Sequence, residues 1–293
     1  MIINPRPKDI GRQGRVMLRM WKAMHRVAKP GIRSIFESER SAAVSAAKSG
    51  ASPSRVAYSV YETGRPLWVK FLRRYWYQTA VAFGSMFFSE ARWYRGQVRA
   101  ENPEKDKVNI DAIIAAMAAG LLLSPGDEGL TGAVTPGNIG MFQDDLTLFI
   151  DRNVNQRATR ISETSSNMAK EGMSALASQN LFGLNQGEEV AAFLSGTFGP
   201  RLAAISETEA HTAGEFGLFA AALAMFGASS VEKQWNAILD ANTRKDHWNA
   251  DEQRQPIGEA FTIGNSAMMY PGDPSAPPEQ TVNCRCFLTY HIL

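Results

Sequence analysis

The sequence predicts an α+β protein whose first two-thirds is mainly helical and whose smaller C-terminal domain ends in a β-strand or hairpin. Before residue 182 apolar residues recur at steps of three and four, and beyond it short apolar runs alternate with turn residues. The last segment, Phe287-Leu288-Thr289-Tyr290, alternates bulky residues as strands do. We therefore expect a basic arm (1–34), a mainly helical region (35–181) and a C-terminal domain (182–293).

Positive charge is concentrated at the N-terminus. Residues 1–34 hold nine Lys or Arg and one acid, Asp9, so they carry +8, and because the chain carries +2 the remainder carries −6. A basic arm on a mildly acidic body suits contact with DNA phosphates or with an acidic protein surface. The candidate contacts are Arg6, Lys8, Arg12, Arg15, Arg19, Lys22, Arg26, Lys29 and Arg33.

Several helices are expected before residue 182. Residues 11–28 carry an apolar stripe, which Lys29-Pro30-Gly31 should end, and the Ala/Ser-rich residues 41–57 predict a linker or a short helix with its stop. Residues 66–98 interleave aromatic rings with Arg and Lys. Such a pattern could stack nucleic-acid bases, but its helical spacing favours a helix that packs its rings into a core or a partner's groove.

Turn and helix signals continue the pattern along the chain. Pro125–Gly140, with five glycines and two prolines, predicts a loop or hinge, and Met141–Leu181 predicts a helix. Asn185–Phe198 predicts a short helix closed by Gly196, and Arg201–Phe226 predicts a longer one. Two pairs have the i,i+4 spacing of helical neighbours, Glu207 with His211 as a surface or partly buried pair, and Asp240 with Arg244 as local helix support.

The sequence shows neither the apolar core of a secretory signal nor a run of about 18 apolar residues, so we expect no membrane span. The nearest apolar run, Ala112–Leu123, is more typical of a buried helix. Cys284 and Cys286 are the two cysteines, and a disulfide across two residues would close a very tight ring. We expect a soluble protein made in a reducing compartment.

An ordered series of motifs runs through the last third. An Arg-containing helix leads into a Thr-Glu pair, a Trp…Asp-x-x-Thr-Arg-x-x-His-x-x-x-Asp stretch follows, and then a Pro-Gly-Asp turn and Asn-Cys-Arg-Cys. In this order, the series over about residues 182–290 resembles the Mu F-like minor head protein domain of tailed bacteriophages. The family pattern usually has Gly after the last Asp of the stretch, where this chain has Glu252. The motif residues are Arg201, Glu209, Trp235, Asp240, Arg244, His247, Asp251, Pro271, Gly272, Asp273, Asn283, Cys284, Arg285 and Cys286.

The resemblance implies a non-enzymatic minor head (capsid) protein that acts in head assembly near the portal and the capsid interior. Its implied partners are the portal protein, the major capsid protein and packaged double-stranded DNA, and its implied locations are the virion head and, during assembly, the host cytoplasm. One alternative is an enzyme or toxin-like effector delivered with the phage genome. An ADP-ribosyltransferase would need more than the acid spacing of Glu207-Thr208-Glu209, which lacks the other motifs. Another is a general DNA-binding module unrelated to virions.

The motif residues also offer zinc chemistry. His247, Cys284 and Cys286 could supply three ligands, with Asp240 or Asp251 as a fourth. We favour instead a packing role, with both cysteines as small buried residues of the final strand and Arg285 on its opposite face. We accordingly expect no catalytic residue and no cofactor, and structural roles for Asn283 and for the turn at Pro271-Gly272-Asp273-Pro274.

Overall fold

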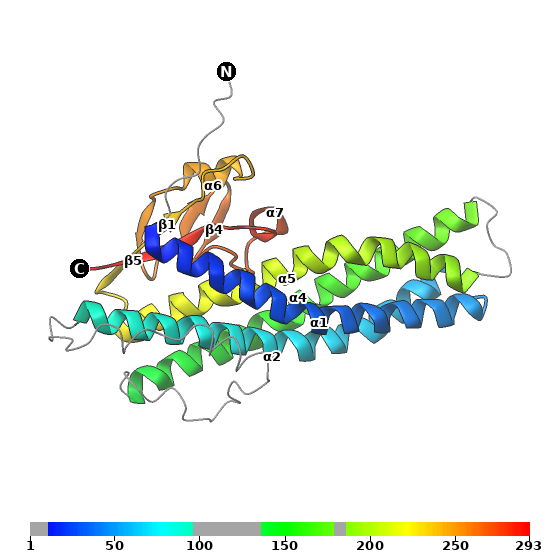
Figure 1. The fold of residues 1–293 in the computed structure, drawn as a ribbon, viewed down its shortest axis with the longest axis horizontal. Helices are drawn as coiled ribbons and strands as arrows, with labels where there is room; N and C mark the ends of the chain where they lie inside the picture. The colour runs from blue at the N-terminus through cyan, green and yellow to red at the C-terminus, as the bar shows by residue number, and fades with distance from the viewer. Residues whose placement is uncertain (1–10, 96–135, 179–185) are drawn as a thin grey trace, which may run out of the picture. The chain divides into compact units, whose positions relative to one another are not determined.

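The structure, a computed structural model, describes residues 11–95, 136–178 and 186–293 (Figure 1). It is mostly helical with a small antiparallel sheet near the C-terminus, which confirms the predicted α+β class. No helix among the described residues has the length and apolar composition needed to cross a membrane. The long helices are α1 (Gly11–Lys48), α2 (Pro53–Arg95), α4 (Pro136–Ser178) and α5 (Gln186–Phe226).

Short elements follow α5 and form the C-terminal region. One antiparallel sheet has the strand order β2 (Arg254–Pro256), β1 (Val231–Asn236), β5 (Phe287–Ile292). A separate antiparallel pair consists of β3 (Phe261–Ile263) and β4 (Ser266–Met268). The predicted final strand is confirmed, because Phe287–Ile292 pairs with Val231–Asn236 along its whole length. The short helices of this region are α6 (Lys245–Asn249) and α7 (Pro278–Thr281).

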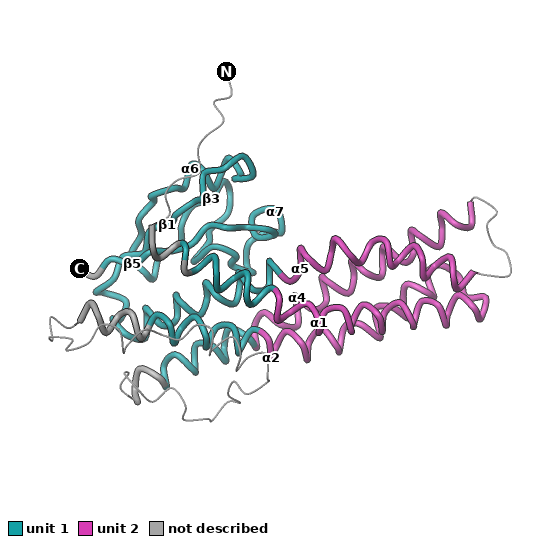
Figure 2. The backbone as a smooth tube through the Cα atoms, in the orientation of Figure 1, with its two compact units in different colours: residues 1–25, 76–150, 207–293 teal, residues 26–75, 151–206 magenta. Residues whose placement is uncertain are grey.

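The chain divides into two compact units, each built from segments distant in sequence (Figure 2). Unit 1 comprises residues 1–25, 76–150 and 207–293, and unit 2 comprises residues 26–75 and 151–206. This division differs from the boundaries that we predicted at residues 34 and 181. The first of these falls inside α1, so the described part of the expected basic arm is the start of a long helix, and the second lies outside the described residues.

The prediction that Lys29-Pro30-Gly31 ends the first helix is wrong, because α1 continues to Lys48. Ala28 and Ile32 are fully buried on either side of the proline, and their packing offsets the cost of about 3 kcal/mol of an interior proline. Gly31 serves close packing: a Cβ there would lie 2.5 Å from a ring carbon of Phe71.

The prediction that Gly196 closes a short helix is also wrong, because α5 runs without a break from Gln186 through Pro200 to Phe226. Val190, Leu194 and Phe198 are buried at intervals of four, so one helix face stays packed across the glycine. Likewise, Pro136 begins α4 rather than belonging to a loop, in keeping with the fixed φ of proline in a first helical turn. Residues 112–123 and 125–135 lie outside the described part of the chain.

The aromatic rings of α2 pack into the protein, as the helical interpretation predicted. In unit 2, Trp68 is fully buried and its indole N–H donates to the carboxylate of Glu39 at 2.8 Å. In unit 1, Trp76 and Phe83 are fully buried, and Trp76 stacks on Phe149 with ring centroids 5.2 Å apart. For the described part of this segment, burial leaves these rings without the open face that base stacking requires.

Unit 2 also holds Arg201, the first motif residue. Its guanidinium donates to the hydroxyl of Ser165 at 2.8 Å and to the carbonyl of Ile161 at 3.2 Å, and it lies over the ring of Phe36. Burial raises the pKa of the neighbouring Glu39 to about 7, although hydrogen bonds from Trp68 and Ser165 and the charge of Arg201 oppose this shift. Arg201 therefore stabilises a buried polar network between helices of unit 2.

Candidate functional site

A buried polar face of α5 forms one wall of the site in unit 1. Thr208, His211, Thr212 and Glu215 are buried at steps of three and four, so they share one side of the helix. Each makes a hydrogen bond to the backbone of the C-terminal region. The contacts are Asn283 N to Thr208 at 3.2 Å, His211 to Cys286 O at 2.7 Å, Thr212 to Gly272 O at 3.0 Å, and Leu288 N to Glu215 at 3.2 Å.

We did not predict this buried polar face from the sequence. The signal that could have revealed it is the spacing of its polar residues, at steps of three and four within an alanine-rich helix. The expected pair of Glu207 and His211 is wrong. His211 is buried and its ring packs edge-on against Trp21 at 4.7 Å, whereas Glu207 lies 4.0 Å from His25. Burial also lowers the pKa of His211, which favours a neutral imidazole at this position.

The expected helical pair of Asp240 and Arg244 is also wrong, because the chain between β1 and α6 is not helical. The carboxylate of Asp240 instead accepts two hydrogen bonds from the guanidinium of Arg285, at 2.6 and 2.5 Å. These bonds are the main reason why the pKa of Asp240 is lowered. Arg244 donates to the carbonyl of Val282. Arg244 and Arg285 therefore tie the loop after β1 to the loop before β5.

The chain turns after α6 at Glu252, a position where the pattern that the sequence resembles usually has glycine. Glu252 adopts a left-handed φ of 67°, and its N–H donates to the carbonyl of Trp235 at 2.8 Å. Asp251 accepts a hydrogen bond from the backbone N–H of Ala237 at 2.8 Å. Trp235 itself is fully buried and packs edge-on against the ring of His247.

Replacing Glu252 with glycine is expected to stabilise the protein by about 0.5–1 kcal/mol, because glycine removes left-handed strain but adds freedom to the unfolded chain. Urea denaturation of the variant and of the original chain measures this gain. Glu252→Ala is the control, because alanine removes the carboxylate and keeps the strain. An equal gain from alanine would show that strain is not the cause.

The Pro-Gly-Asp turn packs against α5. Gly272 has a φ of 79°, and Asp273 accepts hydrogen bonds from Met269 N at 2.9 Å and from the backbone and hydroxyl of Ser275 at 2.9 and 2.6 Å. Together with the bond from Thr212, these contacts fix a rigid turn, in keeping with the structural role that we expected.

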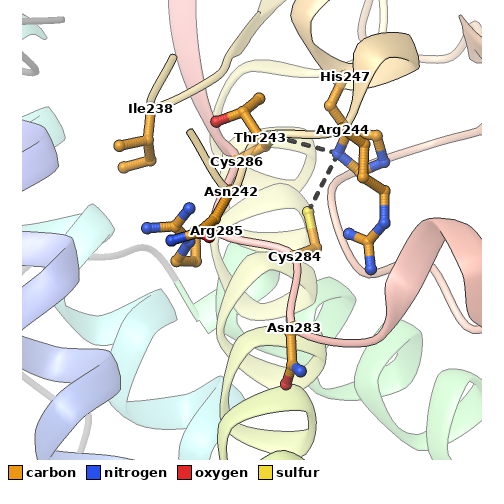
Figure 3. A pocket seen from close by; sticks show the side chains of 9 residues that line it. All are labelled: Ile238, Asn242, Thr243, Arg244, His247, Asn283, Cys284, Arg285 and Cys286. Atoms are coloured by element: carbon orange, nitrogen blue, oxygen red, sulfur yellow. Dashed lines mark hydrogen bonds between the residues drawn. The ribbon is translucent and has the colours of Figure 1, made fainter. Parts of the chain in front are cut away.

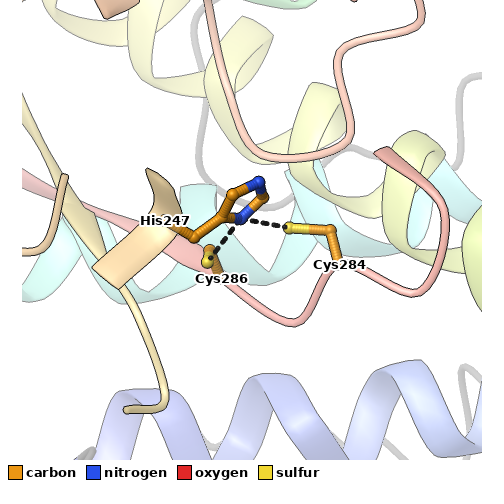
Figure 4. A group of neighbouring side chains, drawn as sticks. All are labelled: His247, Cys284 and Cys286. Atoms are coloured by element: carbon orange, nitrogen blue, oxygen red, sulfur yellow. Dashed lines mark hydrogen bonds between the residues drawn. The ribbon is translucent and has the colours of Figure 1, made fainter. Parts of the chain in front are cut away.

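At the centre of the site, the imidazole of His247 lies between two thiols (Figure 4). Its Nδ1 is 3.3 Å from Cys286 Sγ and 3.5 Å from Cys284 Sγ, and the three potential ligand atoms lie within 4.8 Å of one another. Both cysteines are buried, as predicted, and both are free thiols in the structure. Their expected position in the final strand is wrong: they precede β5, in a loop where Asn283 has a φ of 54°.

The two thiols differ in acidity. Burial opposes ionisation of Cys284, but a hydrogen bond with Cys286 and the nearby imidazoles of His211 and His247 outweigh it, so its pKa lies well below the ordinary value. Burial and the adjacent Cys284 raise the pKa of Cys286. The pKa values of the two neighbouring thiols are therefore shifted in opposite directions.

A small cavity of about 10 Å³ adjoins the cluster, which is about the room that one water needs (Figure 3). Of the two aspartates considered as fourth zinc ligands, neither belongs to the His-Cys-Cys cluster found among the described residues. Asp240 is held by Arg285, and Asp251 by the backbone of Ala237. The cavity is lined by Ile238, Asn242, Thr243, Arg244, His247, Asn283, Cys284, Arg285 and Cys286.

The basic residues proposed as DNA contacts form a stripe along α1. Intervals of four and three residues place the described ones on one helix face, and all are exposed except the half-buried Lys29. The buried Met17, Met20 and Met24 occupy another face. Arg6 and Lys8 lie outside the described residues, as does the side chain of Arg12. The stripe consists of Arg15, Arg19, Lys22, Arg26, Lys29 and Arg33.

Comparisons with known proteins found no matching family model, no matching curated protein and no matching solved structure.

Proposed function

We propose that the protein is a minor head protein of a tailed bacteriophage, with a structural role in head assembly near the portal and the capsid interior. The observation that carries the proposal is the convergence of the motif series. Within the series that resembles the Mu F-like pattern, Asp240 accepts from Arg285 and His247 contacts Cys286, while Arg244 donates to Val282 beside the motif residue Asn283. A motif series conserved for a fold's framework is expected to converge in this way.

The small room beside His247 favours this role over an enzyme or toxin-like effector whose substrate would bind at this cluster. A small-molecule substrate such as NAD needs a pocket of roughly 300–1,000 Å³, whereas the cavity beside His247 measures about 10 Å³. The basic stripe of α1 supplies a surface for the proposed partners, which are packaged double-stranded DNA or acidic patches of the portal and major capsid proteins.

Mass spectrometry of particles from the phage or prophage that encodes the chain tests the proposal. Full heads are expected to contain the protein at few copies relative to the major capsid protein, and heads from a deletion strain should assemble poorly. Comparing full with emptied heads shows whether the protein leaves with the DNA. Finding the protein only in the soluble fraction, with normal heads in the deletion strain, would contradict a head role.

Reversing charge on the stripe is expected to weaken DNA binding at low salt. The triple variant Arg15→Glu, Arg19→Glu, Lys22→Glu should also flatten the salt dependence, because each lost phosphate contact lowers the log–log slope by about 0.9. Mobility shifts of a duplex at several salt concentrations measure both effects. The control reverses three exposed lysines of other elements, Lys70, Lys170 and Lys245. If the stripe variant and the control variant bound DNA equally well, the stripe would instead be assigned to a protein partner.

A further inference from the structure

We propose that His247, Cys284 and Cys286 bind one zinc ion, with a water from the adjoining cavity as the fourth ligand. The distances are those of a zinc site. Tetrahedral bonds of about 2.3 Å to sulfur and 2.0–2.1 Å to nitrogen place the nitrogen about 3.5 Å from each sulfur. The Nδ1 of His247 lies 3.3 and 3.5 Å from the two Sγ atoms. The three potential ligand atoms lie within 4.8 Å of one another, so small side-chain movements bring them to one ion.

The imidazole of His247 is held in the orientation that a ligand needs. Its Nε2 lies 2.9 Å from the amide oxygen of Gln280, and the amide nitrogen of Gln280 donates to the carboxylate of Asp246 at 3.0 Å. Because an amide oxygen only accepts, Nε2 carries the proton and Nδ1 presents its lone pair to the thiols. Metal-binding histidines are usually held by such a second hydrogen bond, which fixes the tautomer and the plane of the ring.

The donor set selects the metal. Two thiols and one imidazole suit zinc and other soft or borderline ions, whereas magnesium and calcium prefer oxygen ligands. All three side chains are buried, so the backbone around them is already packed before an ion arrives. Binding deprotonates both thiols, which form two zinc–sulfur bonds, and the protons pass to solvent.

The fourth position faces the cavity rather than a protein side chain, among the residues that the structure describes. His211, the nearest further imidazole, donates from Nε2 to the carbonyl of Cys286, and its Nδ1 lies against Gly272. The cavity beside the cluster has room for about one water. Arg244 and Arg285 line it, so their positive charge favours a water or a small anion on the ion.

The first test measures metal in the full-length chain, purified under reducing conditions without metal-affinity resin or chelator. One zinc per chain is expected in elemental analysis. After zinc is removed, cobalt(II) should bind with equal stoichiometry and give the absorption of a tetrahedral thiolate site. Folded, reduced protein that retains no zinc and gives no cobalt–thiolate absorption would overturn the proposal, whether or not the protein is found in phage heads.

Variants locate the ion. Cys286→Ala and His247→Gln are expected to lose stoichiometric zinc, and the control His291→Gln should keep it, because His291 lies in β5 and bonds Gln234 instead. Gln280→Leu removes the bond that positions the ring, together with the bond to Asp246, and leaves the three ligands in place, so it should weaken zinc affinity by about 10–100-fold. Full zinc retention by Cys286→Ala and His247→Gln would place the ion elsewhere and overturn the assignment. Should these variants fail to fold, the cobalt spectrum of the unaltered chain decides.

Discussion

Replacing Lys233 with alanine is expected to lower the free energy of unfolding by about 3–5 kcal/mol, because the change empties a packed position in unit 1. Lys233 is fully buried in β1, and its ammonium lies between the rings of Phe219 and Phe261, 5.1 and 4.9 Å from their centroids. It donates to the carbonyl of Met269 at 2.7 Å. Lys233→Met fills the same space without the donor, so it should cost less, about 1–3 kcal/mol for the unpaired carbonyl. Urea denaturation of the three proteins measures both losses.

The same lysine is expected to make stability depend on pH. Burial lowers its pKa from 10.5 to about 7, although Asp273 and Glu259 raise it. Between these values the unfolded chain holds a proton that the folded protein releases, so stability rises as the pH increases through this window. The gain from pH 7.5 to 9 is about 1–2 kcal/mol, because one pKa unit corresponds to about 1.4 kcal/mol.

Lys233→Met is the control for the pH effect, because it lacks the titrating group and keeps every other one. As the pH increases from 7 to 9.5, the unfolding free energy of the original chain should therefore rise relative to that of this variant. Parallel stability curves from pH 7 to 9.5 would show that the ammonium keeps its ordinary pKa in the fold.

The features of the fold that the sequence predicts are those set by interactions between residues close together along the chain. Helical periodicity is a local signal, so the positions of the long helices and of the final strand were predictable. Helix ends were not, because Pro30 and Gly196 are local stop signals that are overridden by the burial of Ala28 and Ile32 and of Val190, Leu194 and Phe198.

The site follows the same rule. Residue type alone suggested His247 and both cysteines as possible ligands of one ion, and the structure brings their ligand atoms within 4.8 Å of one another. The partners of the other motif residues were not predictable, because Asp240 pairs with Arg285 far along the chain rather than with the i,i+4 neighbour Arg244. Nothing in a strand of alternating residues revealed that Lys233 is buried, since that depends on rings contributed by α5 and β3.

Replacing Gly272 with alanine is expected to destabilise the protein by about 3–5 kcal/mol, because left-handed strain and a steric clash add together. Gly272 has a φ of 79°, and a Cβ there would lie 2.7 Å from Nδ1 of His211 and 3.3 Å from the backbone Cα of Thr212. The imidazole cannot retreat freely, because its Nε2 is bonded to the carbonyl of Cys286. Thermal or urea denaturation gives the loss.

Gly227→Ala separates the two causes. Gly227 directly follows α5 and has a φ of 76°, but nothing lies within 4 Å of its Cβ position. Alanine there meets strain alone and should cost about 1 kcal/mol. The remaining loss of about 2–4 kcal/mol at Gly272 then measures the contact with His211 and Thr212. In a double-mutant cycle, His211→Ala should remove part of that excess, because the clashing ring is gone. Equal losses at Gly227 and Gly272 would instead mean that the turn shifts away from α5 at little cost. In that case the contact between Gly272 and His211 would not help to hold the imidazole on the carbonyl of Cys286.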